Sequence, residues 1–332
     1  MDYRALGQTG LKLSALGFGC GAIGGLLVRG DYPTMRRTVA RAIEQGVNYF
    51  DTASMYGSGQ SEVNLGAVLR EIGANVVVGT KARLAPADME HIEDAIIHSV
   101  EGSLRRMGRE SVDLIQFHNR IEPQRQTGQD PAAGLKDLDL VLSAFKRLQQ
   151  QGKIRHYGIT GLGATQALHR AAASGGFHTM QVCYNLLNPT AGSAVSPPRF
   201  PFQDYSQLID HCAEGEIGVI AIRVLAGGSL SGTTQRHPVA AQTVEPIGTA
   251  PFFSADVTKA QVFSFLVDDG YCSTLIEAAI RFAISKTWVS TALVGISSPE
   301  QLEQAVTFVE RGALPAEALA RLPEVWSRFA PS

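Results

Sequence analysis

The sequence is poor in cysteine and tryptophan. Its 332 residues include four cysteines and two tryptophans. No two cysteines form a Cys-x-x-Cys pair, and all are widely spaced: Cys20, Cys183, Cys212 and Cys272. Such spacing argues against a disulfide framework or a zinc site and is typical of buried free thiols in a reducing compartment. We therefore predict a cytoplasmic protein with no metal centre.

Charge is scarce and nearly balanced. Charged residues make up 18% of the chain, the formal net charge is −2, and no basic cluster is visible. Electrostatics therefore gives no argument for a nucleic-acid partner or an anionic membrane. The Met-Asp-Tyr-Arg start lacks the basic-then-apolar pattern of a signal peptide. The Gly-rich uncharged stretch from Leu13 to Val28 is shorter than the roughly 18 residues that a spanning helix needs. We expect no membrane association.

The chain does contain a regular alternation of short apolar runs and amphipathic segments. Eight runs read as buried parallel strands: 16–20, 47–50, 75–80, 113–117, 156–160, 180–184, 219–225 and 291–296. Each is followed by a segment with helical spacing, near 33–45, 61–71, 89–107, 138–151, 165–174, 205–213, 274–285 and from Ser298 on, where Pro299 and Gln301 indicate a capping box. This alternation predicts a single α/β domain over 1–332, a closed (β/α)8 TIM barrel.

Several segments fall outside the repeating pattern. Residues 1–15 are predicted to form a β-hairpin, and 314–329 an extra C-terminal helix. Three long connections, 119–137, 186–204 and 226–271, follow predicted strands, and the last includes a possible helix near 255–267. All three would lie at the C-terminal face of the barrel, where their polar, Pro- and Gly-rich composition fits loops that shape a substrate pocket.

Four polar side chains follow three successive predicted strands. Asp51 comes after the apolar run ending at Phe50, and Tyr56 lies five residues further on in a Gly-rich loop. Lys81 and His118 end the next two strands. In a parallel barrel these strand ends meet at the face where ligands bind, so we expect the four side chains to lie together.

Each of the four residues alone would be an ordinary surface or packed residue, but together they fit a proton donor to a carbonyl group. A free tyrosine has a pKa of about 10 and is a poor acid at neutral pH. A nearby lysine ammonium favours the phenolate and is expected to lower the pKa of Tyr56. Asp51 would pair with Lys81 and keep it charged, and His118 would donate to or orient the substrate oxygen.

At this point the sequence resembles the aldo-keto reductase superfamily. The opening Tyr3-Arg4-Ala5-Leu6-Gly7, the later Leu16-Gly17-Phe18-Gly19 and the Tyr56-Gly57 motif followed by Ser61-Glu62 are similar to that family's signatures. The match continues in register to the segment 297–302 and so covers essentially the whole chain. The resemblance implies that Asp51, Tyr56, Lys81 and His118 form the catalytic tetrad.

The resemblance also implies a nicotinamide dinucleotide, NADP or NAD, bound in extended form across the barrel mouth. The implied cofactor contacts are Asp51, Thr160, Gln181, Leu225 beside the Gly227-Gly228 turn, Ser297, Gln301 and Gln304. Three positions depart from the family. Thr160-Gly161 stands where Ser-Asn is usual, Ile222 stands where an aromatic usually stacks on nicotinamide, and no Lys or Arg occurs between Lys286 and Arg311 to hold the 2′-phosphate of NADP. We therefore expect NADH to be tolerated.

Three glycines suggest a different kind of dinucleotide site. Gly19, Gly21 and Gly24 follow a predicted strand with the spacing of a dinucleotide fingerprint, and Asp51 ends the next strand. That interpretation would give a doubly wound fold. However, Gly24 does not open a helix, because the signals for a helix start come only at Asp31-Tyr32-Pro33. We therefore expect the glycines to let a loop approach a ligand.

The leading function is an NAD(P)H-dependent oxidoreductase, an alcohol dehydrogenase or carbonyl reductase that acts on a small aldehyde, ketone or sugar. One alternative is a non-redox barrel enzyme in which Lys81 forms a Schiff base. Another is a cofactor-binding regulatory subunit like the channel-associated members of the superfamily. Arg223 either meets an anionic or polyhydroxylated substrate or pairs locally with a carboxylate or backbone carbonyl. The physiological substrate, the direction of the reaction and the oligomeric state stay open.

Overall fold

A computed structural model of the chain describes residues 1–194 and 200–329. Eight parallel strands close into a barrel in the order β10-β11-β12-β3-β4-β5-β6-β9. Their bounds are β3 Leu16–Gly19, β4 Tyr49–Asp51, β5 Val77–Ala82, β6 Val112–Phe117, β9 Ile154–Gly161, β10 Thr179–Cys183, β11 Gly218–Ile222 and β12 Val289–Gly295. The predicted (β/α)8 barrel is confirmed, and the doubly wound alternative is wrong.

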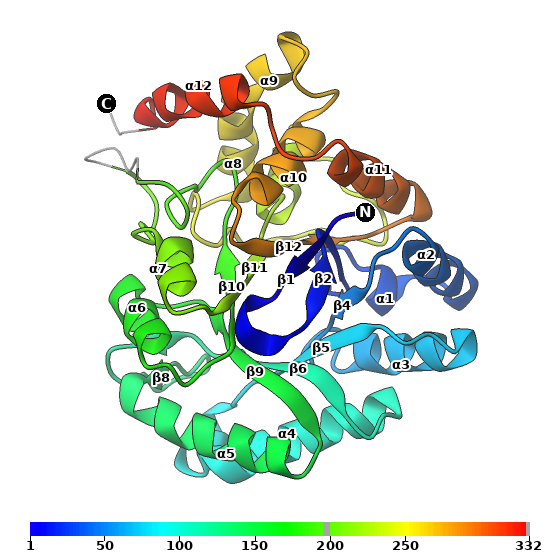
Figure 1. Ribbon diagram of the computed structural model, residues 1–332, viewed down its shortest axis with the longest axis vertical. Coiled ribbons are helices and arrows are strands. Elements are labelled where there is room, and N and C mark those ends of the chain that lie inside the picture. The colour runs from blue at the N-terminus through cyan, green and yellow to red at the C-terminus, as the bar shows by residue number, and fades with distance from the viewer. Residues whose placement is uncertain (195–199, 330–332) are drawn as a thin grey trace.

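Helices surround the barrel on the outside (Figure 1). They are α1 Leu26–Arg29, α2 Tyr32–Glu44, α3 Gln60–Ile72, α4 Ile92–Met107, α5 Leu138–Gln150, α6 Thr165–Ala173, α7 Leu208–Glu214, α8 Phe253–Ala260, α9 Phe265–Asp268, α10 Leu275–Ser285, α11 Pro299–Glu310 and α12 Ala316–Ser327. The sequence explains their packing. In α4, for example, Ile92, Ile96, Val100 and Leu104 recur every four residues and are all buried against the sheet.

The N-terminal hairpin closes the bottom of the barrel. Strands β1 (Tyr3–Ala5) and β2 (Lys12–Ser14) pair antiparallel, as predicted, and cross the centre of the barrel in Figure 1. Leu6 and Leu13 are fully buried and form one apolar cluster with Tyr49, Leu114 and Ile220, which come from three barrel strands. The bottom of the barrel is therefore packed, and the polar residues gather at the other end.

The glycines after β3 serve close packing. A Cβ atom on Gly24 would lie 2.5 Å from the backbone nitrogen of Ile296, just beyond β12. A side chain there would push the two segments apart, so Gly24 lets the loop after β3 lie against the end of β12. This contact gives a packing reason for the last glycine of the spacing that resembles a dinucleotide fingerprint.

Two predicted elements differ from the structure at the C-terminal face. Strand β11 ends at Ile222 and not at Leu225, because the next residue, Arg223, has a left-handed backbone with φ of 58°. The expected helix near 255–267 is divided into α8 and α9. In the connection 119–137, the two-residue strands β7 (Ile121–Glu122) and β8 (Ala133–Gly134) pair in parallel. The connection 186–204 is described only in part, because 195–199 lie outside the described residues.

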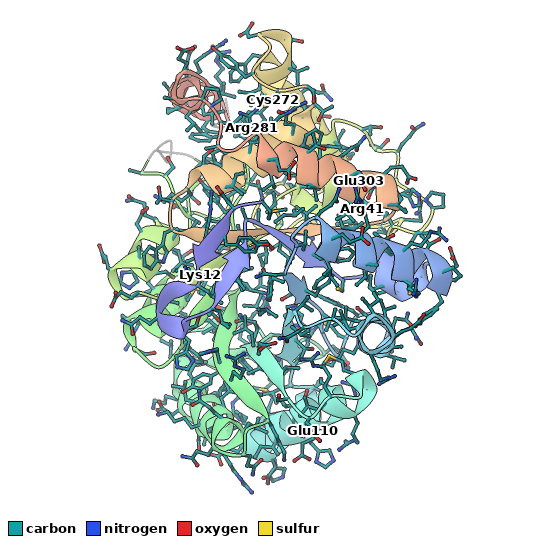
Figure 2. All side chains as sticks on the ribbon, turned by 45° about the vertical axis from the view of Figure 1, so that its right-hand side comes forward. Lys12, Arg41, Glu110, Cys272, Arg281 and Glu303 are labelled. Atoms are coloured by element: carbon teal, nitrogen blue, oxygen red, sulfur yellow. The ribbon has the colours of Figure 1, made fainter. Side chains whose placement is uncertain are left out.

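An ion pair joins helices α2 and α11. The Nε of Arg41 on α2 lies 2.7 Å from Oε1 of Glu303 on α11, and Figure 2 shows the two side chains meeting between these helices. The four cysteines are free and buried, as predicted. Among the described residues, no helix is long and apolar enough to cross a membrane.

Candidate active site

The centre of the site is a buried ion pair between two strands. Asp51 is the last residue of β4, and Lys81 is the penultimate residue of the neighbouring β5. The Lys81 ammonium donates to Oδ1 of Asp51 and, over 2.8 Å, to the backbone carbonyl of Thr52. Their side chains are only 1% and 2% exposed, so water screens the pair little. Both residues belong to the strands themselves and not, as predicted for Asp51, to the loops that follow.

Three further residues complete the surroundings of Asp51. Its Oδ2 accepts hydrogen bonds from the Tyr49 hydroxyl at 2.8 Å and from Nε2 of Gln181 at 2.6 Å. The Oε1 of Gln181 in turn accepts from the Thr160 hydroxyl at 3.3 Å. Thr160, Gln181, Asp51 and Lys81 thus form one continuous network across β9, β10, β4 and β5, which fixes the position of the ammonium group.

Tyr56 lies in a tight turn between β4 and α3. Its backbone N–H donates to the carbonyl of Ala53, and its own carbonyl accepts from the N–H of Ser61. Gly57, with φ of 61°, adopts the left-handed backbone that this turn needs. The turn brings the Tyr56 ring over Lys81, whose Nζ lies 4.9 Å from the ring centroid. The Tyr56 ring and the Lys81 ammonium group are therefore direct neighbours.

Ser61 and Glu62, at the start of α3, hold the Tyr56 turn in place through hydrogen bonds to neighbouring segments. The Ser61 hydroxyl donates to the carbonyl of Cys20. The buried carboxylate of Glu62 accepts from Thr80 on β5 and from Arg106 on α4, each within 2.6 Å. These bonds tie the start of α3, which follows the Tyr56 turn, to the strand that carries Lys81.

The pKa of Tyr56 differs from the sequence-based expectation. Burial raises the pKa of this phenol, and although Lys81 acts in the opposite direction, the net pKa lies above the ordinary value. Lys81 does lower the pKa of Tyr56, as expected, but the rise caused by burial is larger. For Lys81 burial lowers the pKa, yet Asp51 and Tyr56 together reverse this and raise the pKa above the usual value. Lys81 is therefore an ammonium ion at neutral pH.

His118 follows β6 and is neutral. Burial, with the nearby charges of Lys81 and Arg83, holds the pKa of its imidazole well below the ordinary value. Its ring lies edge-on to the Tyr56 ring, with centroids 6.2 Å apart. Nδ1 is buried and has no hydrogen-bond partner among the described residues. A neutral imidazole has one N–H, so it can donate one hydrogen bond to a carbonyl oxygen held beside Tyr56.

All the residues predicted for the site border one cavity of about 1390 Å³ at the C-terminal face. They are the four tetrad residues together with Thr160, Gln181, Leu225, Ser297, Gln301 and Gln304. The lining includes Tyr56 and His118 in one part and the N-terminus of α11 in another. After the roles expected from the sequence, we call these two parts the catalytic end and the adenosine end.

The adenosine end is organised by the start of α11. The Ser298 hydroxyl caps this helix by accepting from the N–H of Gln301 at 3.4 Å. The side chain of Gln301 turns back, but its Oε1 accepts from the N–H of Ser297, one residue before the one that a capping box would use. The neutral Ser and Gln side chains at this end leave the helix terminus without a cation from α11 itself.

A loop from the long connection 226–271 contributes a cation to the lining of the cavity. Arg236 and His237 border the cavity together with Gln301 and Gln304. The Arg236 guanidinium donates to the carbonyls of Gly227, at 2.7 Å, and Ala241. Burial, and then the like charge of Arg223, lower its pKa. Its hydrogen bonds to the backbone hold the loop against the Gly227-Gly228 turn.

Arg223 has the local backbone partner that was one of the two alternatives expected for it, and contact with a substrate stays a prediction. It borders the cavity, and its Nη2 donates to the carbonyl of Glu245 at 2.5 Å. Its Nε is buried without a partner among the described residues. The local carbonyl partner is therefore present, while one donor stays unused. Ile222 also borders the cavity, in the position expected for an aromatic residue.

Some residues of the site were not predicted. Tyr49 precedes Asp51 by two positions on the same strand, so the period of two along a strand would have placed both side chains on one face. Arg83 and Arg120 likewise follow Lys81 and His118 by two positions and border the cavity. Among the described residues, no group of three or more His, Cys, Asp and Glu side chains is arranged to hold a metal ion.

The fold and the site geometry agree with comparisons to known proteins. The model of the aldo/keto reductase family matches residues 15–327, and the chain belongs to this family. It is 28% identical to aldo-keto reductase YhdN of Bacillus subtilis, over 91% of this chain and 87% of that protein. It is 26% identical to L-galactose dehydrogenase of Arabidopsis thaliana, over 98% and 94% of the two chains.

A solved structure extends the likeness to three dimensions. The fold resembles aldo-keto reductase AKR11C1 from Bacillus halodurans in its holo form, with a TM-score of 0.70. The two chains are 24% identical, and the match covers 100% of this chain and 97% of the other. At this level of identity the likeness concerns the fold.

Proposed function

We propose that the protein is an NAD(P)H-dependent oxidoreductase that interconverts the carbonyl group of a small aldehyde, ketone or sugar and the corresponding alcohol. The observation that carries this proposal is the arrangement at the catalytic end. A half-buried tyrosine lies against a buried lysine–aspartate pair and beside a neutral histidine, in a cavity long enough to extend to a helix N-terminus.

In the proposed reaction, Tyr56 gives its proton to the carbonyl oxygen and takes it back in the reverse direction. Lys81 stabilises the phenolate that remains, because its charge lies 4.9 Å from the ring centroid. Asp51 keeps the ammonium group protonated and fixed. His118 donates its N–H to the same oxygen and orients the substrate. The apolar bottom of the barrel holds these groups in a fixed geometry.

The cavity fits a nicotinamide dinucleotide, which when bound would supply the hydride. Thr160 and Gln181 offer hydroxyl and amide groups near the catalytic end, although in this structure Gln181 contacts Asp51. Leu225 borders the middle, and Ser297, Gln301 and Gln304 border the adenosine end. The helix terminus of α11 offers a favourable place for an anionic group. The cofactor is NADP or NAD, and a metal has no role in the proposed reaction.

A Schiff base at Lys81 fits the geometry less well. An amine must lose its proton before it attacks a carbonyl carbon. Asp51 and Tyr56 raise the pKa of Lys81, and its Nζ is engaged with Asp51 and Thr52. The ammonium form is thus the stable one, which suits an electrostatic role.

The proposal is tested by titrating the protein with NADPH and NADH while following the cofactor fluorescence, and then by assaying a panel of aldehydes and sugars. We expect binding of a reduced cofactor and its oxidation over many turnovers. Cofactor binding without turnover on any of the carbonyl compounds would instead support a regulatory cofactor-binding subunit. Trapping of a substrate adduct on Lys81 by borohydride would revive the Schiff-base alternative.

A further inference from the structure

Two arginines border the cavity next to the tetrad, and neither has a role in the proposed reaction. Arg83 follows Lys81 by two residues, and Arg120 follows His118 by two residues. Both side chains border the same cavity as Tyr56 and His118. Each arginine therefore lies close along the chain to a tetrad residue and shares the cavity with it.

Both arginines are held by one carboxylate from a loop. The Nη2 of Arg83 donates to Oδ1 of Asp130, and the Nε of Arg120 lies 3.8 Å from Oδ2 of the same residue. Among the described residues, Asp130 is the carboxylate within ion-pair distance of either arginine. Two guanidinium groups thus share a single negative charge. Glu122 and Glu245 also border the cavity but make no ion pair with them.

The contact with Asp130 is easy to exchange. Its side chain is 59% exposed, and it belongs to the connection 119–137 between β6 and α5. Ion pairs between exposed side chains contribute at most about 1 kcal/mol, because water competes for both partners. The other bonds of these arginines are weak or local: Nη1 of Arg83 contacts the Met55 sulfur at 3.3 Å, and Nη2 of Arg120 donates to Gln126 at 3.3 Å. A ligand carboxylate or phosphate can therefore take the place of Asp130.

We propose that the substrate is a carbonyl compound with an acidic group, a carboxylate or a phosphate, and that Arg83 and Arg120 bind this group. This inference rests on the proposed oxidoreductase function and names the substrate class of the same site. The acidic group displaces Asp130, whose carboxylate stands in for it in the substrate-free protein. Arginine suits this task because its planar fork of donors matches the oxygens of both acids.

The test compares acidic and neutral substrates of the same length at fixed ionic strength. Succinic semialdehyde is paired with butyraldehyde, and glyceraldehyde 3-phosphate with glyceraldehyde. We expect kcat/KM to favour the acid by about tenfold or more in at least one pair, since a hydrogen bond to a charged group contributes about 1.5–3 kcal/mol. A preference in the first pair alone assigns a carboxylate, and in the second alone a phosphate. Equal rates in both pairs overturn the inference.

Variants locate the effect. Arg83→Gln and Arg120→Gln should each reduce the preference for the acid over the neutral aldehyde about tenfold. For Arg120→Gln, kcat/KM for the neutral aldehyde should stay within about threefold of the wild-type value. Asp130→Asn should increase the preference, because it removes the competing carboxylate. Arg36→Gln, at an exposed arginine paired with Glu71 on the outside of the barrel, is the matched control and should change nothing. An unchanged preference in both cavity variants contradicts the assignment.

Binding gives a readout that needs no turnover. Calorimetric titration with 4-hydroxybutyrate and 1-butanol, with and without NADPH, involves only reduced compounds. We expect the acid to bind at least about tenfold more tightly than butanol, and Arg83→Gln to remove the difference. If no aldehyde is reduced but the acid binds in this way, the proposed reaction fails and the anion site stands. If aldehydes are reduced and the acid has no advantage, the anion site fails alone.

Discussion

The catalytic end and the adenosine end of the cavity hold their polar groups in different ways. At the catalytic end, charged side chains come from adjacent barrel strands, are almost fully buried, and are bonded to one another: Asp51 alone accepts from Lys81, Tyr49 and Gln181. At the adenosine end, neutral side chains come from one helix terminus, and Arg236, a cation that borders the same cavity, belongs to a loop. If the proposed function holds, we expect the chemistry to be fixed by the barrel and the choice of cofactor by the helix terminus and the loop.

This contrast follows from the cost of burying charge. An ammonium and a carboxylate can leave water only as a pair with further hydrogen bonds. Lys81 and Asp51 meet that condition because neighbouring strands fix their separation. The adenosine end lies at the rim, where water and backbone amides can solvate a phosphate. A fixed cation is therefore not needed for binding there, although it is needed for strong selection of NADP.

The largest effect is expected where the catalytic end loses its proton donor. Tyr56→Phe removes the hydroxyl and leaves the ring over Lys81. Carbonyl reduction should fall about 10²–10⁴-fold, the usual contribution of a general acid. Steady-state kcat, together with fluorescence titration of NADPH, checks this. Cofactor affinity should stay unchanged, and wild-type turnover by the variant would show that another group donates the proton.

The next test removes the charge of Lys81, which lowers the pKa of Tyr56 while burial raises it. Lys81→Met should lower the rate of alcohol oxidation at neutral pH by about 10²-fold. In this direction Tyr56 acts as a base, so the rate rises with pH as the phenol ionises. Burial raises the pKa of Tyr56 and Lys81 lowers it, so loss of Lys81 moves this rise to higher pH. The pH dependence of kcat/KM is the measurement.

The same change leaves Asp51 as a buried charge without its cation, and unfolding by this route has to be excluded. The double variant Lys81→Met with Asp51→Asn removes both charges and serves as the control. It should melt at a higher temperature than the single variant, since an unpaired buried charge costs about 3–5 kcal/mol. A pH profile that is the same in wild type and in both variants would mean that Lys81 and Tyr56 are not coupled.

The sequence predicted the barrel and the residues of the catalytic end because both depend on local patterns. Apolar runs and helical spacing define the strands and helices, and parallel strands bring their C-terminal ends together. Asp51, Tyr56, Lys81 and His118 could therefore be grouped without knowledge of contacts, and family resemblance pointed to the same four. Their catalytic roles stay predictions for the experiments above.

The features that the sequence did not predict depend on how deeply side chains are buried and on how loops fold. The net direction of the pKa shift of Tyr56 was expected to be downward, because the lysine was visible in the sequence and the depth of the ring was not. The backbone turn at Arg223 that ends β11 early has no local pattern, since a left-handed arginine is rare. The shared contact of Arg83 and Arg120 with Asp130 depends on how the connection 119–137 folds.

A third test weakens the contact between α10 and the C-terminal end of α11, the helix whose N-terminus forms the adenosine end. Glu277 on α10 is buried and bonds to Arg281 and to Arg311, the residue that follows α11. Although burial opposes it, these arginines and Ser273 lower the pKa of Glu277 to about 2. The carboxylate thus contributes stability above the ordinary pKa of about 4.3. That stability is lost as the pH falls from there towards about 2.

Glu277→Gln should therefore destabilise the protein by about 3 kcal/mol at pH 7, since it breaks a buried ion pair. The difference from wild type should shrink as the pH falls below about 4. Urea unfolding at several pH values measures both effects. A constant difference across this range would show that the charge of Glu277 is not what stabilises α10 and α11.

The smallest expected effect concerns the choice between the two cofactors. No Lys or Arg lies between Lys286 and Arg311, and Glu300 and Glu303 add negative charge to α11. The helix terminus contributes about 0.3–1 kcal/mol to phosphate binding. We therefore expect less than about 100-fold discrimination between NADPH and NADH, or under roughly 2.7 kcal/mol.

Two variants show how much of the discrimination between NADPH and NADH comes from α11 and how much from the loop that carries Arg236. Gln301→Arg should shift the ratio of kcat/KM for NADPH and NADH about tenfold towards NADPH if its side chain reaches the ribose phosphate. It also removes the bond from Ser297, at a cost of about 1 kcal/mol to the cap. Arg236→Gln should weaken both cofactors alike, because this guanidinium is engaged with the carbonyls of Gly227 and Ala241. A wild-type ratio of kcat/KM for NADPH over NADH in the thousands, lost in Arg236→Gln, would instead show that Arg236 holds the phosphate. The adenosine end would then select NADP as firmly as the catalytic end fixes its proton donor.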